Sequence, residues 1–244
     1  MRYTNYFLVL IALPSMALAS PAEFSLGSIH FNQETISPTL QVFALLTLLS
    51  LAPSLLIMLS SFTRIIVVLS MLRNGLGLQQ TPPNSVLMSL ALFLTFFTMM
   101  PVINTIYTEA YVPFQAKQIS FETAVSKIET PIKHFMLQQT HEKDLKMILQ
   151  LAKEPIPSKA KDVKFYQLIP AFLLSELQTA FQIGFMIFLP FLLVDLIVSG
   201  ILMTMGMMMM PPMTISLPIK ILLFVLIDGW DLVVQSLVSS FNLT

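Results

Sequence analysis

The sequence contains no cysteine and few charged residues. The absence of cysteine among 244 residues excludes disulfides, thiolate metal sites and cysteine nucleophiles. Charged residues make up 11% of the chain and hydrophobic residues 55%, whereas about a quarter of the residues in a soluble domain are charged. The composition therefore favours a membrane protein or a subunit of a membrane complex. Because the formal net charge is zero, nothing indicates the basic surface that nucleic-acid binding requires.

Signals of catalysis are also missing. There are only seven glycines, and neither a phosphate-binding glycine loop nor a serine-hydrolase or zinc-protease motif is present. His134 and His141 lie near Glu142 and Asp144 and could imitate a metal site, but solvated surface histidines are the simpler interpretation. We therefore expect no enzyme, no metal and no cofactor.

The first 19 residues have the pattern of a secretory signal peptide. Arg2 supplies a positive start, Phe7 to Leu13 an apolar core, and Ala17-Leu18-Ala19 a small-x-small cleavage site. The alternative is an uncleaved membrane helix, but the apolar stretch ends within about a dozen residues, whereas a span needs about 20. We expect cleavage after Ala19, followed by a polar N-terminal segment over 20–38.

The segment 39–106 is predicted to be a first hydrophobic helical hairpin. Apolar residues dominate from Leu40 to Leu72, which is long enough for one tilted helix, and again from Val86 to Ile106. Between these stretches, two glycines and the pair Pro82-Pro83 predict a turn, since glycine suits the end of a helix and proline its first turn.

The segment 107–167 differs in character from its flanks. It holds nine of the thirteen Lys/Arg residues and seven of the thirteen acidic residues, and so we expect a water-exposed insert. Ser120 and Thr130-Pro131 are typical of helix starts. The insert is predicted to form two or three short amphipathic helices.

The segment 168–244 is predicted to be a second hydrophobic hairpin. Apolar stretches over Leu168–Met210 and Met213–Val238 flank a turn at Pro211-Pro212. The fold class is then all-α, with four hydrophobic helices in two hairpins that share a plan and suggest at most a weak internal repeat. A signal peptide would place the termini and the insert on the periplasmic side, although nine lysines are unusual in a short translocated loop.

Several charged residues lie inside the apolar segments, where facing lipid would cost about 2.5 to 3.5 kcal/mol each. Either they form a transport site or they form buried ion pairs and subunit contacts in an assembly. The acidic residues do not share one depth, which favours the assembly. Asp228, Asp231 and Gln235 line one helical stripe. The charged set comprises Arg64, Glu176, Asp195, Lys220, Asp228 and Asp231.

A methionine run stands at the tip of the second hairpin. Met207 to Met210, together with Met203, Met205 and Met213, gives seven methionines in eleven residues. Flexible apolar side chains from several copies could close a pore and yet yield to a passing polypeptide. The alternative is that they fill an irregular core or face lipid, and the residue types alone leave both open.

Three long stretches carry a family resemblance: SFTRIIVVLSMLRNGLG, QTPPNSVLMSLALFLTFFTMMPV, and the segment from Phe181 through GMMMMPP to Trp230. They resemble the FliP/SctR family of type III secretion export-gate subunits, in particular its flagellar branch. The resemblance covers nearly all of the chain after the signal peptide. It implies a non-enzymatic subunit, present in several copies, that builds a helical channel for unfolded flagellar subunits in the inner membrane at the flagellar basal body.

The resemblance also implies partners and roles. The partners are FliQ- and FliR-like subunits, FlhB- and FlhA-like components, export substrates and lipid. Met205 and Met207 to Met210 would seal the pore, and Glu176 would lie at a subunit contact. The alternatives are the equivalent subunit of a virulence injectisome, or a secondary transporter that uses Glu176, Asp195 or Asp228.

Overall fold

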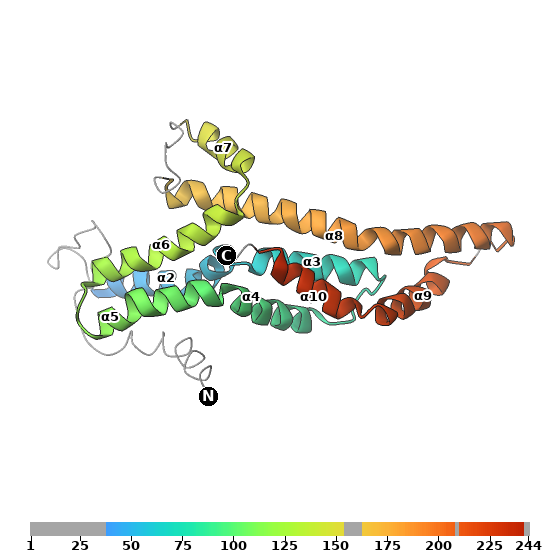
Figure 1. The fold of residues 1–244 in the computed structure, drawn as a ribbon, viewed down its shortest axis with the longest axis horizontal. Helices are drawn as coiled ribbons and strands as arrows, with labels where there is room; N and C mark the ends of the chain where they lie inside the picture. Colours follow the sequence, from blue (N-terminus) through green and yellow to red (C-terminus); the bar gives the residue numbers. More distant parts are fainter. Residues whose placement is uncertain (1–37, 154–162, 208–209, 242–244) are drawn as a thin grey trace. The chain divides into compact units, whose positions relative to one another are not determined.

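The structure is a computed structural model that describes residues 38–153, 163–207 and 210–241. All regular structure in these residues is helical and none is strand, which confirms the all-α prediction. Residues 1–48 and 49–244 form two separate compact units. The expected signal peptide lies outside the described residues. The helices within the second unit are drawn in Figure 1.

The apolar stretch from Leu40 to Leu72 forms two helices instead of the single one expected. Helix α2 spans Pro38–Met58 and α3 spans Phe62–Gly75. Ser60 Oγ donates to the Ile57 carbonyl oxygen (3.1 Å) and accepts from the Phe62 amide (3.4 Å). Such local serine bonds compete with the helical ladder, and the sequence contains no proline or glycine at this break.

A turn follows α3 and leads into a long helical run. The run consists of α4 (Asn84–Ile106), a π-helical turn η2 (Tyr107–Tyr111) and α5 (Val112–Gln115). Gly77 has a φ of 81°, a left-handed conformation that glycine adopts without strain. Helices α3 and α4 pack against each other. Pro82 and Pro83 lie in this turn, with Pro83 at the N-cap of α4.

The insert contains α6 (Phe121–Gln139) and α7 (Glu142–Leu151). Ser120 caps α6, since its hydroxyl accepts from the Thr123 amide, which confirms one predicted helix start. The predicted start at Thr130-Pro131 is wrong, because α6 continues through Pro131. Buried residues on both sides, among them Ala124 and Phe135, hold the helix together despite the hydrogen bond that proline removes.

The last part of the chain begins with α8, a 40-residue helix over Phe165–Thr204. Helix α9 spans Met213–Leu226 and α10 spans Gly229–Ser239, with a 66° bend between them. The single helix expected from Met213 is therefore broken. Asp228 at the break has a left-handed φ of 50°. Figure 1 shows α9 beside the far end of α8 and α3 beside its middle.

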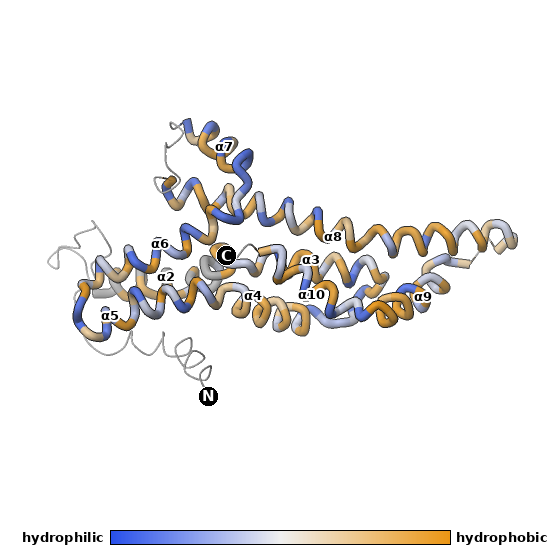
Figure 2. Tube along the Cα trace, in the orientation of Figure 1, coloured by the Kyte–Doolittle hydropathy of each residue, from blue (hydrophilic) through white to orange (hydrophobic). Residues whose placement is uncertain are grey.

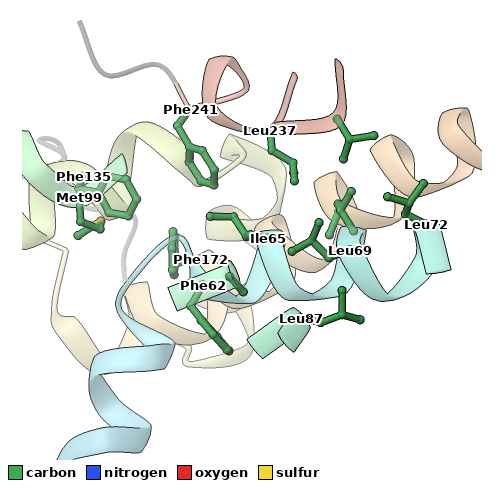
Figure 3. Close-up of a cluster of buried hydrophobic side chains, with 14 of the residues drawn as sticks. Phe62, Ile65, Leu69, Leu72, Leu87, Met99, Phe135, Phe172, Leu237 and Phe241 are labelled. Atoms are coloured by element: carbon green, nitrogen blue, oxygen red, sulfur yellow. The ribbon is translucent and has the colours of Figure 1, made fainter. Parts of the chain in front are cut away.

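The core of this unit is centred on α3. Ile65, Val68, Leu69 and Leu72 are fully buried and recur at helical spacing, so they form one stripe. Helix α8 packs against this stripe, and α4, α6 and α10 add side chains around it. Figure 3 shows Phe172 of α8 and Leu237 of α10 beside α3.

Two helical runs among the described residues are long and apolar enough to cross a membrane. They are Asn84–Gln115 and Phe165–Thr204, and the bent pair α9–α10 would be a third if it counts as one span. Length and composition are the only basis for this assignment. Figure 2 shows hydrophobic residues along α4, α9 and the second half of α8, and hydrophilic ones on α6 and α7.

Candidate functional site

Four charged residues of the apolar segments form two ion pairs within the chain. Two acidic residues, Asp228 and Asp231, have no cation beside them among the described residues. The deepest pair joins Arg64 of α3 to Glu176 of α8, which are 2% and 0% exposed. Arg64 Nε donates to Glu176 Oε2 at 2.9 Å, and Nη2 donates to Oε1. This two-point contact fixes both distance and orientation between the helices.

The remaining donors of Arg64 are also used. Nη1 donates to the Ser240 carbonyl oxygen (2.9 Å) and to Ser240 Oγ (3.1 Å), while Nη2 donates to Gln139 Oε1 (3.1 Å). The guanidinium lies 4.0 Å from the ring centroid of Phe241. All five donors of this side chain are thus satisfied, and one residue joins α3, α8, the end of α6 and the residues after α10.

The second pair lies farther along α8. Lys220 Nζ of α9 donates to Asp195 Oδ2 of α8 at 2.6 Å and to the Gly75 carbonyl oxygen at the end of α3 at 3.2 Å. The Lys220 side chain is 5% exposed and that of Asp195 is 35% exposed. Since an ammonium without a partner is costly in apolar surroundings, this pair holds α9 against α8 and α3.

Arg73 forms hydrogen bonds across the turn of the first hairpin. Its Nη1 donates to Asn84 Oδ1 (2.6 Å) and to the Pro82 carbonyl oxygen (3.3 Å). The end of α3 is thereby joined to the start of α4.

The methionine-rich tip begins where α8 ends. Gly206 has a φ of 73°, its amide donates to the Met203 carbonyl oxygen, and the Met207 amide donates to that of Leu202. These two bonds form a Schellman motif, which terminates the helix. The methionine side chains described here are exposed: Met203, Met205, Met207, Met210 and Met213.

Met208 and Met209 lie outside the described residues. Pro211 and Pro212 lead into α9, with Pro212 at its N-cap. The tip is therefore an exposed apolar surface at the end of a long helix, and such surfaces mark contacts with other molecules.

Asp228 and Asp231 are exposed at the break between α9 and α10. Among the described residues, Gln235 is the one side chain that binds either of them: its Nε2 donates to Asp231 Oδ2 at 2.9 Å. Asp231 and Gln235 thus share a helix face, as predicted, but the predicted stripe is wrong for Asp228, which lies at the left-handed break before α10. No cation among the described residues pairs with either carboxylate.

The sequence indicated the charged residues but not their partners. Glu176, which the resemblance assigns to a subunit contact, is fully buried and paired with Arg64 of its own chain. Gln139, Ser240 and Phe241 were not recognised, because nothing in the spacing of residues so far apart indicates that they meet. The one feature that these three residues share is that each is a polar or aromatic residue at or just after the end of a helix.

The insert is joined to α8 by a smaller polar cluster, which the sequence did not indicate. Ser175 Oγ donates to Asp144 Oδ2 (2.7 Å) and accepts from the His141 amide (2.9 Å). His141 Nδ1 lies 3.3 Å from the same carboxylate oxygen. His134 is exposed, and no group of three or more metal-ligand side chains occurs in the described part of the chain.

Known proteins match the chain over most of its length. A model of the FliP family matches residues 45–237. Flagellar biosynthetic protein FliP of Bacillus subtilis (strain 168) is 52% identical over 210 residues, which cover 86% of this chain and 95% of the relative. The protein of the same name from Agrobacterium fabrum (strain C58 / ATCC 33970) is 45% identical over 243 residues, 99% of each. That of Pectobacterium carotovorum subsp. carotovorum is 54% identical over 203 residues, 83% of this chain and 79% of the relative.

Proposed function

The chain belongs to the FliP family, non-enzymatic components of the flagellar protein export apparatus, and on this premise we propose that it is a core channel-forming subunit of the export gate. Several copies associate with FliQ- and FliR-like subunits and with FlhB- and FlhA-like components. The assembly conducts unfolded flagellar subunits across the inner membrane. The polar insert and the termini lie on the periplasmic side.

The observation that carries this proposal is the length of the exposed apolar surface on α8. Exposed hydrophobic side chains extend from Leu174 to Met203, about 45 Å at ~1.5 Å per residue. The hydrocarbon core of a bilayer is only about 30 Å thick, and tilts beyond about 40° are unusual. Lipid cannot cover the whole stretch, and so other protein chains cover part of it. The exposed set includes Phe181, Phe185, Met186, Leu189, Leu192, Leu193, Leu196, Ile197 and Ile201.

The internal ion pairs support a structural role for two of the carboxylates in the apolar segments. Glu176 and Asp195 each bind a cation of the same chain, whereas a transporter needs carboxylates that are free to exchange a proton or an ion. The Arg64–Glu176 pair acts on the assembly by fixing α3 against α8. The named relatives are flagellar, which favours flagellar export over an injectisome.

The methionine tip is the proposed seal. Met205, Met207 and Met210 are exposed at the end of α8, and subunits arranged around one axis would bring their tips together. Unbranched methionine side chains can fill an irregular gap and then rearrange around a polypeptide. A seal of this kind is a property of the oligomer and not of one chain.

Replacing Met207 to Met210 by alanine tests the seal. Cells that carry this variant are expected to leak ions or small solutes while the complex still assembles, since Met207 and Met210 are exposed side chains. Met186→Ala is the matched control, since Met186 is 70% exposed on the same helix but away from the tip. Unchanged permeability in the tip variant would contradict the seal.

Native mass spectrometry of the detergent-extracted complex tests the assembly. The expected result is a defined oligomer of this chain that also contains other small hydrophobic subunits. A stable, lone monomer would contradict the proposed function.

A further inference from the structure

The junction of α9 and α10 exposes an apolar surface that contains two carboxylates. Leu226, Ile227 and Trp230 are 74%, 50% and 40% exposed, and Asp228 and Asp231 lie among them. We call these five residues the junction face. An exposed apolar surface with embedded acids is poorly suited to lipid, because a carboxylate that faces hydrocarbon is costly.

The charge balance of the two hydrophobic segments leaves these carboxylates without a counter-charge. Segments 39–106 and 168–244 together contain three basic and four acidic residues. Arg64 binds Glu176, Lys220 binds Asp195, and Arg73 binds Asn84 and the Pro82 carbonyl oxygen. Asp228 and Asp231 are the two acidic residues that remain.

Helix capping does not account for both residues. Asp228 is at the N-cap of α10 and Asp231 is in its first turn, where the helix dipole favours negative charge. However, the Asp228 side chain makes no capping hydrogen bond, and Asp231 accepts from Gln235. The left-handed backbone of Asp228 would be met as well by asparagine, and so the backbone does not explain the charge.

We propose that the junction face docks an apolar helix of a different polypeptide, and that an arginine or lysine of this helix lies between Asp228 and Asp231. This inference rests on the proposed assembly and names the chemistry of one partner within it. The apolar residues supply contact area. The two carboxylates select the partner that carries the matching charge, as complementary charges do at protein interfaces.

A second copy of this chain fits the junction face poorly. The cations of the described hydrophobic helices are all engaged within the chain, as shown above. Gln139 of the insert meets, through Arg64, the end of α10 that lies away from the junction. The junction is one helix length away, about 16 Å at 1.5 Å per residue. A second copy would have to meet the junction face with a cation from an internal ion pair or from its insert, whereas a different polypeptide can carry a free cation within an apolar helix.

The partner can be identified by photocrosslinking from the full-length chain in cells. A benzoylphenylalanine at Trp230 is expected to crosslink to a peptide from a different protein, apolar and helical in pattern, with an arginine or lysine in it. A crosslink to another copy of this chain, or to lipid alone, would overturn the proposal.

Charge neutralisation then tests whether the carboxylates matter. Asp228→Asn with Asp231→Asn is expected to lower the amount of the crosslinked partner in the extracted complex at least about tenfold, a typical loss for one side of a desolvated charge pair. Glu122→Gln with Glu129→Gln, two exposed acids of α6, is the matched control and should leave the partner bound.

The outcomes separate this inference from the function on which it rests. The double asparagine variant should still form an oligomer of this chain. Replacing the partner's cation by glutamate should abolish binding of the partner, and Asp228→Arg should restore it. Retention of the partner by the double variant would overturn the junction face alone. Absence of any oligomer in the wild-type complex would instead overturn the proposed function.

Discussion

The first and second halves of α8 differ in what surrounds them. In the first half, Phe172 and Glu176 are completely buried: Glu176 binds Arg64 of α3, and Phe172 contacts Phe135 of α6. In the second half, Leu193 and Leu196 are 61% and 75% exposed, and Lys220 supplies the one polar pair. One helix thus passes from a core into a surface that the described residues cover only in part, chiefly through α9.

The difference indicates which part of the molecule folds by itself. The first half lies in the core, and its Glu176 accepts from two nitrogens of Arg64. The second half exposes apolar area that other subunits cover in the proposed assembly, because a monomer rarely exposes so large an apolar surface without a binding role. Four predictions sharpen this contrast, from the largest expected effect to the smallest.

Arg64→Ala should have the largest effect on stability. It leaves Glu176 buried without its cation, which costs about 3 to 5 kcal/mol for a fully buried pair. The free energy of unfolding of the detergent-solubilised chain, measured by urea titration, would report this loss. Lys146→Ala, at an exposed pair on α7, is the control. A loss below about 1 kcal/mol would contradict the assigned role of the Arg64–Glu176 pair in fixing α3 against α8.

The Lys220–Asp195 pair should matter less, and its two members should matter unequally. Asp195→Asn leaves the 5% exposed Lys220 without a carboxylate, whereas Lys220→Met leaves an Asp195 that is 35% exposed and partly solvated. We expect the first to cost about 1 to 3 kcal/mol and the second to cost less. Hydrogen exchange of the α9 amides measures both. The reverse order would contradict the assigned burial.

Alanine substitutions at two glycines of α8 compare the packed and the exposed parts of the helix. A Cβ at Gly184 would lie 2.3 Å from Met71 Sδ, whereas nothing lies within 4 Å of a Cβ at Gly200. Gly184→Ala should therefore destabilise the isolated chain by about 1 to 3 kcal/mol, and Gly200→Ala should stabilise it by up to about 1 kcal/mol. Thermal unfolding compares them. Met71→Ala should partly rescue Gly184→Ala, and equal effects of the two alanines would contradict the contrast.

The surface of the insert should contribute least. The hydrogen bond and the charge of Lys146 lower the pKa of the Glu142 carboxyl below its ordinary value of 4.5. Because this pKa is lowered on folding, the ionised Glu142 side chain contributes to stability above pH 4.5, and this contribution is lost as the pH falls through the pKa of the folded state. Because Glu142 is fully exposed, Glu142→Gln should leave the unfolding midpoint unchanged at neutral pH. A clear shift of the unfolding midpoint at neutral pH would contradict the expectation that the surface of the insert contributes little to stability.

Composition and the capping residue Ser120 predicted the helical class and the start of α6. They failed at two positions, for different reasons. Pro131 lies inside α6 because buried residues flank it, and the break after Met58 arises from serine hydrogen bonds. The break at Asp228-Gly229 did have a signal, since this dipeptide is typical of turns.

The partners of the charged residues could not be predicted from the sequence. Arg64 and Glu176 are separated by more than a hundred positions, and a helical pattern specifies a face but not which face of another helix it meets. Burial could be inferred from the cost of a charge in an apolar segment. Pairing required the packing of α3 against α8.

The most direct test of the central claim uses the absence of cysteine, which allows single spin labels to be attached without background. Labels at Leu174, Leu189 and Met203 report whether each position faces lipid, water or protein, through their accessibility to oxygen and to a water-soluble nickel complex. In the assembled complex we expect at least one of the two end labels to be shielded from both reagents, because the apolar surface is longer than a bilayer can cover. Free access of oxygen to all three labels would contradict the account.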